Sequence, residues 1–214
     1  MKKLSVFVLI FIFCSITVKS QSLKPEKGDW VAEVNFAPFS SSPVSINYLR
    51  ARKFIENKKA LRLGIFLGAD IQKPDEDQKN STFEINIRPG IEIHFDGTDK
   101  LSPYVGGELD LAYKKSGSTF DAPGAQEFTI EGAWSPFGLE RGFYRIGLNA
   151  IAGADFYIAK QIYLGTEFGF GFEFIKQADI VEKFNDTVTN EVKGGSTFQL
   201  GPNFNSALRL GFKF

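Results

Sequence analysis

Charged side chains recur at alternate positions within otherwise apolar segments of this chain, a spacing that places them on one face of a strand. A charge held away from water is costly unless an opposite charge pairs with it. Counting residues back from the expected turns, we predict a network of ion pairs inside the protein. The pairs are Arg62 with Glu92, Arg88 with Asp110, Arg145 with Glu173, and Arg209 with Glu33.

The remaining residues include few groups that could catalyse a reaction. Acyl transfer needs a histidine with a serine and a carboxylate, and His94 is the only histidine. We expect it to face inward near Tyr104 and to form hydrogen bonds there. The acidic run Asp75–Asp77 is typical of a solvated loop tip. With no phosphate-binding loop and no Cys or His cluster, we predict no enzyme activity, cofactor or metal site.

The segment Phe83–Phe95 shows which element positions these residues. Its odd-numbered residues are apolar, and its even-numbered residues are polar, charged or glycine. This period of two indicates one strand with an apolar face and a charged face. Strands of soluble proteins usually have about 5–6 residues, whereas a tilted strand that crosses a bilayer needs about 9–11. The length therefore favours a membrane strand.

Seven further segments repeat this pattern, so the sequence predicts eight strands. They are Trp30–Phe36, Val44–Phe54, Leu61–Asp70, Phe83–Phe95, Tyr104–Lys114, Phe143–Ile158, Ile162–Phe174 and Thr197–Phe214. Every second connection is a short turn, and the later connections on the other side are long, which is typical of barrels that span a membrane. We expect an all-β, antiparallel, up-and-down transmembrane barrel whose two termini lie in the periplasm.

Residues 1–20 have the features of an export signal. Two lysines precede the apolar stretch Leu4–Ile16, and we expect cleavage before Gln21. The remaining domain, residues 21–214, would lack cysteine, because Cys14 lies within the signal. Without the three lysines of the signal, it has 22 basic and 25 acidic residues, a net charge of −3. This balance gives no reason to expect a nucleic-acid partner.

Alternation alone does not decide whether the apolar face points into lipid or toward a central ligand, as in a soluble lipocalin-like carrier. The polar face contains many glycines, which suit the narrow lumen of an eight-stranded barrel. Aromatic residues lie near the expected strand ends, as in the girdles at membrane interfaces. They are Trp30, Tyr104 or Tyr113, Tyr144 and Phe174. We therefore expect lipid around the apolar face.

The chain ends on a strand whose alternate residues are Leu208, Leu210, Phe212 and Phe214. Over residues 21–214 it resembles the small outer-membrane β-barrel proteins of Gram-negative bacteria, and the segment Leu61–Gly64 also looks like these proteins. The resemblance implies an outer-membrane location and contact with outer-membrane lipid. It also implies periplasmic chaperones and a barrel-assembly machinery that reads the four terminal residues as its signal.

Fold does not determine function, so the resemblance transfers no activity. We expect a monomeric, non-enzymatic barrel whose lumen is plugged by the paired charges. Its role would be structural or surface interaction through the long outer loops, residues 115–141 and 176–196. Within the first of these, we expect Phe128–Trp134 to extend a hairpin beyond the membrane. The first alternative is narrow porin-like transport of a small or apolar molecule. The second is the soluble lipocalin-like carrier.

Overall fold

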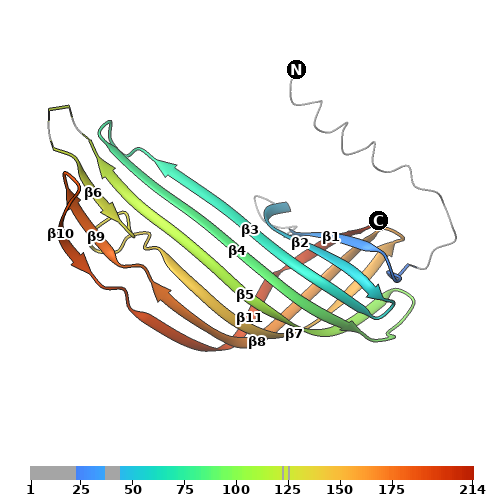
Figure 1. Cartoon of the computed structure of the whole chain (residues 1–214). Coiled ribbons are helices and arrows are strands. Elements are labelled where there is room, and N and C mark those ends of the chain that lie inside the picture. The colour runs from blue at the N-terminus through green and yellow to red at the C-terminus, as the bar shows by residue number, and fades with distance from the viewer. Residues whose placement is uncertain (1–22, 37–43, 122, 125) are drawn as a thin grey trace, which may run out of the picture.

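Eight antiparallel strands form a ring in the computed structural model (Figure 1). The structure describes residues 23–36, 44–121, 123–124 and 126–214, without the side chains of 44–47 and 203–207. The predicted export signal lies outside these residues. The ring strands are β1 (Trp30–Phe36), β2 (Val44–Glu56), β3 (Lys59–Gln72), β4 (Gln78–His94), β5 (Leu101–Phe120), β7 (Phe143–Ala159), β8 (Ile162–Gln177) and β11 (Ser196–Lys213).

The ring closes where the last strand meets the first. β11 pairs with β8 on one side and with β1 on the other, and β5 pairs with β7. The backbones of Trp30 and Phe214 exchange two hydrogen bonds, of 3.0 and 2.9 Å. We call this the terminal end of the barrel. No helix among the described residues is long and apolar enough to cross a bilayer. The predicted all-β, up-and-down barrel of eight strands is confirmed.

The apolar residues of the ring strands face outward, as predicted. Phe170, for example, is 55% exposed in the middle of β8, and its neighbours Phe168 and Phe172 are also exposed. Of the two tyrosines considered for the aromatic girdle, Tyr113 lies on this outer surface, whereas Tyr104 is buried in the lumen. An apolar exterior around a charged interior is the opposite of a lipocalin-like carrier, so the structure contradicts that alternative.

β2 departs from the predicted pattern at its centre. Tyr48 was expected on the lipid face, but its ring lies inside, under the guanidinium groups of Arg50 and Arg88 at 5.7 and 5.3 Å from the ring centroid. The pairing of β2 with β1 shifts between Val34 and Asn35. A bulge of this kind reverses which residues face inward, and it explains why the alternation is irregular near Arg50.

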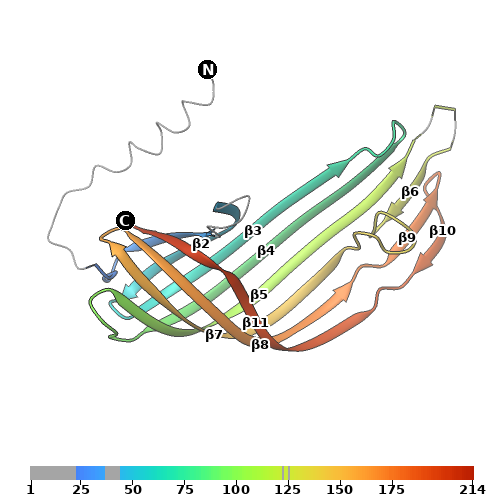
Figure 2. The same ribbon diagram turned by 180° about the vertical axis from the view of Figure 1, so that it is seen from behind.

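Three short strands extend the wall at the end opposite the termini. β6 (Phe128–Glu131), β9 (Ile180–Phe184) and β10 (Thr187–Val192) continue the sheet beside the outer part of β5 (Figures 1 and 2). We call β6, β9, β10 and residues 115–120 of β5 the blade. Segments 115–141 and 176–196 were predicted as loops, apart from a hairpin extension at Phe128–Trp134. β6 lies within that portion, whereas β9 and β10 were not predicted. Alternation disappears where neither face touches lipid, although the backbone pairing continues.

Candidate functional site

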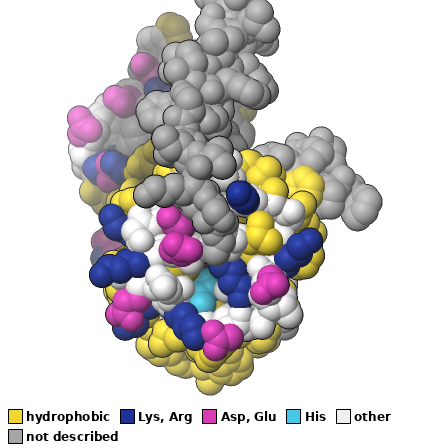
Figure 3. Space-filling view, turned by 90° about the vertical axis from the view of Figure 1, so that its right-hand side faces the viewer, with side chains coloured by type: hydrophobic (Ala, Val, Ile, Leu, Met, Phe, Trp, Pro, Cys, Tyr) yellow, Lys and Arg dark blue, Asp and Glu magenta, His cyan; other side chains and the backbone are white. Residues whose placement is uncertain are grey.

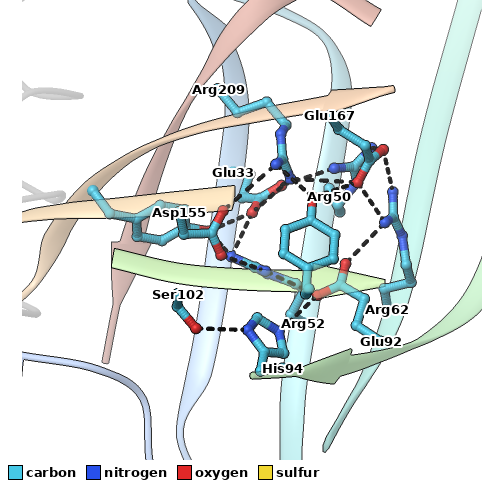
Figure 4. Close-up of polar contacts among 12 residues, drawn as sticks. Glu33, Arg50, Arg52, Arg62, Glu92, His94, Ser102, Asp155, Glu167 and Arg209 are labelled. Carbon is cyan, nitrogen blue, oxygen red and sulfur yellow. Dashed lines mark hydrogen bonds and ion pairs between the residues drawn. The ribbon is translucent and has the colours of Figure 1, made fainter. Parts of the chain in front are cut away.

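A buried ionic cluster fills the lumen in the half of the barrel next to the terminal end (Figure 4). It contains four arginines and five carboxylates, and each of these side chains is at most 6% exposed. We call it the plug. Its members are Glu33, Arg50, Arg52, Arg62, Glu92, Glu108, Asp155, Glu167 and Arg209.

Arg52 and Arg62 hold most of the carboxylates. Arg52, whose side chain is 0% exposed, contacts Glu33 at 2.7 Å, Glu92 at 2.9 Å and Asp155 at 2.8 Å. Arg62 contacts Glu92 at 2.8 Å and also reaches two more carboxylates, Glu108 and Glu167. Buried charges are tolerated when opposite charges and hydrogen bonds surround them. Each guanidinium here contacts at least two carboxylates, but the Nε atom of all four arginines has no hydrogen-bond partner among the described residues.

Every strand of the ring contributes at least one charged side chain to the plug. The contributions run from Glu33 on β1 through Arg50 and Arg52 on β2 to Arg209 on β11. The pair Arg209 Nη1 and Glu33 Oε2, at 3.0 Å, joins residues 176 positions apart in sequence. The plug therefore ties together the whole circumference of the barrel rather than a single hairpin.

All four predicted ion pairs are present in the structure, but two predicted registers were wrong. Arg62 Nη1 lies 2.8 Å from Glu92, although the residue opposite Arg62 is Gly90. Arg145 lies opposite Ile175, and its Nε is 3.9 Å from Glu173. These pairs form diagonally, because an arginine is long enough to reach a neighbour two residues along the facing strand. Alternation predicts the face of a residue, not its register.

Three of the other predicted residues form a second, smaller cluster nearer the blade. Arg88 lies 3.1 Å from Asp110, and Arg145 lies 3.3 Å from the same carboxylate. Arg88 and Arg145 are 25% and 19% exposed, whereas Asp110 is fully buried. The lumen thus changes along its axis from a fully buried cluster to one that solvent reaches.

Tyrosines and His94 complete the plug. Tyr104 donates a hydrogen bond to Glu167 and accepts one from Arg209, both at 2.6 Å. His94 contacts Ser102 Oγ at 2.9 Å through Nδ1 and Glu92 at 3.2 Å through Nε2. His94 is therefore a lumen residue near Tyr104, as expected. Figure 3 shows the histidine at the terminal end, with charged side chains around the mouth.

Sequence reasoning missed five members of the plug: Arg50, Arg52, Glu108, Asp155 and Glu167. For three of them, the alternating pattern of the sequence did indicate a position in the lumen. Glu108, Asp155 and Glu167 occupy the polar phase of the predicted strands, and each could have been assigned to the lumen. Arg50 and Arg52 gave no such signal, because the bulge in β2 obscures the phase of that strand.

The blade has a small apolar core and its own polar contacts. Ile130, Ala133 and Ile180 are buried together, and the indole of Trp134 donates to the carbonyl of Ser81 at 3.0 Å. Phe137, on the connection after β6, is 98% exposed. These contacts order segments that were expected to be loops.

At the base of the blade, the side chain of Asp179 connects the segments before β9 and after β10. Asp179 accepts hydrogen bonds from the Gly194 amide at 2.8 Å and from Lys193 at 3.0 Å. The Gly194 amide, together with Lys193, lowers the pKa of Asp179, and the paired carboxylates raise the pKa of Lys193. Among the described residues, no group of three or more His, Cys, Asp or Glu is placed to hold a metal ion.

A ring of eight long strands with an apolar exterior and a charged, filled interior defines a transmembrane β-barrel of the outer-membrane type. The sequence profile of the OmpA-OmpF-like porin family matches residues 66–175, which are 110 of the 214 residues. The chain belongs to this family. No curated protein sequence matches it.

Two solved structures show similar architecture. The outer membrane protein OprG from Pseudomonas aeruginosa has 12% sequence identity and a TM-score of 0.51, over 91% of this chain and 99% of that chain. Ail, the attachment invasion locus protein of Yersinia pestis, has 12% identity and a TM-score of 0.41, over 88% and 99%. At this identity, the likeness to OprG is evidence for the fold alone.

Proposed function

We propose that the chain is a non-enzymatic, monomeric outer-membrane barrel that holds the blade at the cell surface for interaction with other molecules. The observation that carries this proposal is the plug. An eight-stranded barrel has room only for side chains, and here nine charged groups occupy that space in one cluster. A scaffold role is therefore favoured over diffusion through the lumen. The blade, formed within segments 115–141 and 176–196, is the proposed interaction surface.

Planar-bilayer recording tests whether the lumen is closed. We expect the purified barrel to give no steady ion current, because a permeating ion would have to displace buried ion pairs such as Arg52 with Glu92. A steady current from the wild-type barrel would instead support the narrow porin-like alternative.

Cysteine labelling on intact cells tests the orientation. We propose that both termini lie in the periplasm and that the blade faces outward. Cysteine replaces Val188 on the blade in one variant and Lys58 near the terminal end in a matched variant; both positions are exposed. A membrane-impermeant maleimide should label Val188→Cys on intact cells and Lys58→Cys only after the cells are broken. The reverse pattern would refute the orientation.

We propose that Leu208, Leu210, Phe212 and Phe214 are read by the barrel-assembly machinery after periplasmic chaperones deliver the chain. Leu208, Phe212 and Phe214 are exposed on β11. Deletion of Phe214 should lower the amount of heat-modifiable barrel in outer membranes. Phe168→Ala, which removes another exposed ring, is the control. Equal losses in both variants would show a general effect on folding.

The proposal that the barrel is not an enzyme depends on the role of His94. Its neighbours Ser102 and Glu92 have the residue types of an acyl-transfer triad. However, two arginines already hold Glu92, which makes it a structural partner. Hydrolysis of labelled lipid A by the wild-type barrel, with loss of activity in His94→Ala, would overturn the assignment.

A further inference from the structure

The wall of the barrel is incomplete in the half that bears the blade. β1 is shorter than both of its neighbours, with 7 residues against 13 in β2 and 18 in β11. The pairing of β11 with β1 ends at Leu208, and residues 196–205 of β11 pair with β8 on one side only. Among the described residues, none pairs with the other edge of this segment. Within the described structure, this segment has one edge without a strand partner, which we call the free edge.

A cavity of about 510 Å³ surrounds this edge. Gln199 and Gly201 line it from the inner face of β11, and Phe198 and Leu200 line it from the outer face. The cavity is thus open to the lumen and to the surrounding lipid. Its volume lies in the range of small-molecule sites, about 300–1,000 Å³.

Two facing glycines make room for the cavity. Gly201 lies opposite Gly171, and both line it. A Cβ atom added at Gly201 would meet no atom within 4 Å. The space beside Gly201 is therefore vacant within the described structure, and a larger side chain at this position can enter it without displacing the backbone.

The polar side chains that line the cavity accept and donate hydrogen bonds, and its one carboxylate, Glu173, is paired with Arg145 at 3.9 Å. Asn149 is buried, and the side chains of Gln199 and Glu173 complete this inner wall. Asparagine and glutamine amides both donate and accept, whereas a carboxylate only accepts. A hydroxyl-bearing head group suits this set of side chains. Because Arg145 offsets the charge of Glu173, this wall carries no net positive charge that would favour an anionic head group.

The outer wall of the cavity is apolar and faces the membrane. Phe198 and Leu200 are each 65% exposed, and the ring of Phe198 stacks on Phe172 at 6.0 Å. Both lie on the lipid-facing side of β11. A hydrocarbon chain can therefore lie along these residues while its head group turns around the free edge.

We propose that this cavity binds a membrane amphiphile with one hydrocarbon chain and an uncharged, hydroxyl-bearing head group, which enters from the surrounding bilayer. The head group contacts Asn149, Glu173 and Gln199, and the chain lies on Phe198 and Leu200. The inference is independent of the plug and of the blade. It assigns a ligand site to a part of the wall that the proposed scaffold role does not use.

Photo-crosslinking in phosphatidylcholine vesicles tests the site. The probe is a diazirine-bearing monoacylglycerol, and the comparison probe is the fatty acid of the same chain length. We expect saturable labelling of residues 197–202 by the monoacylglycerol, about tenfold above labelling by the fatty acid. Competition by unlabelled monoacylglycerol in the wild-type barrel gives a readout that needs no variant.

Two substitutions and one control sharpen the test. Gly201→Leu fills the cavity and should lower labelling about tenfold. Gly107→Leu adds the same atoms to the lipid face of β5, where a Cβ makes only ordinary contact, and should change nothing. Glu173→Gln should raise labelling by the fatty acid. Heat-modifiable gel migration verifies that each variant is folded.

Three results would overturn the proposal. The first is labelling that never saturates and spreads around the lipid-facing surface in proportion to the probe. The second is labelling at residues 197–202 that Gly201→Leu leaves unchanged. The third is equal labelling by the fatty acid and the monoacylglycerol in the wild-type barrel, which would refute the assignment of the head group.

Discussion

The two halves of the barrel interior accommodate charged side chains in different ways. In the half next to the terminal end, complete strand pairing encloses the lumen, and Arg52 and Arg209 are buried among carboxylates. In the other half, β11 has a free edge, and Arg88 and Arg145 remain partly exposed. Where the wall is closed, charges must neutralise each other; where it is open, water or a ligand can do so.

This difference predicts unequal costs for removing an arginine. Arg52→Ala should lower the free energy of unfolding by about 3–5 kcal/mol, because it leaves Glu33, Glu92 and Asp155 buried without that partner. Arg88→Ala should cost about 1 kcal/mol, because that side chain is partly exposed. Urea unfolding in lipid vesicles measures both. Similar costs at the two positions would show that the halves do not differ.

The blade should unfold separately from the barrel. Ile180→Ala removes a buried side chain from its core and should cost about 2–4 kcal/mol locally. Hydrogen exchange should become faster in β6, β9 and β10, while the melting of the barrel stays unchanged. Val188→Ala, at an exposed position, should have an effect below about 0.5 kcal/mol. A lower melting temperature of the whole barrel in Ile180→Ala would show one cooperative unit.

The smallest expected effect is a pH response at the base of the blade. The Gly194 amide lowers the pKa of Asp179 in the folded chain. Its contribution to stability is therefore present above the unfolded pKa of about 3.9 and is lost as the pH falls through the lower folded value. The protection of the Gly194 amide, measured relative to the intrinsic exchange rate at each pH, should fall on acidification through this range. The Asp179→Asn variant should not show this pH-dependent loss of protection. If the loss persists in that variant, another titrating group causes it.

Sequence reasoning identified the barrel because lipid imposes a strict period of two on every segment that it contacts. Phe83–Phe95 and the strand of Phe168 and Phe170 carried that signal clearly. The blade gave a weaker signal, because lipid does not contact its strands. Only the segment of β6 was expected to extend a hairpin, and β9 and β10 were expected to be loop.

The candidate site could likewise be predicted only where the alternating pattern was regular. Four arginine–carboxylate pairs could be assigned to the lumen, because the position of a residue in the alternating pattern determines which face of the strand it occupies. Arg50 and Arg52 could not, because the bulge at the start of β2 shifts the alternating pattern of that strand. The gap in the wall was also invisible in the sequence, because it depends on where pairing between β1 and β11 ends.

The backbone contact between Trp30 and Phe214 has a consequence for biogenesis. The first and last strands cannot pair until the last strand has been made, because they come from opposite ends of the described chain. Glu33 and Arg209, which sit on those two strands, become partners at the same moment. Their contact can therefore form only when the ring closes, whereas pairs such as Arg62 with Glu92, on the adjacent strands β3 and β4, can form before closure.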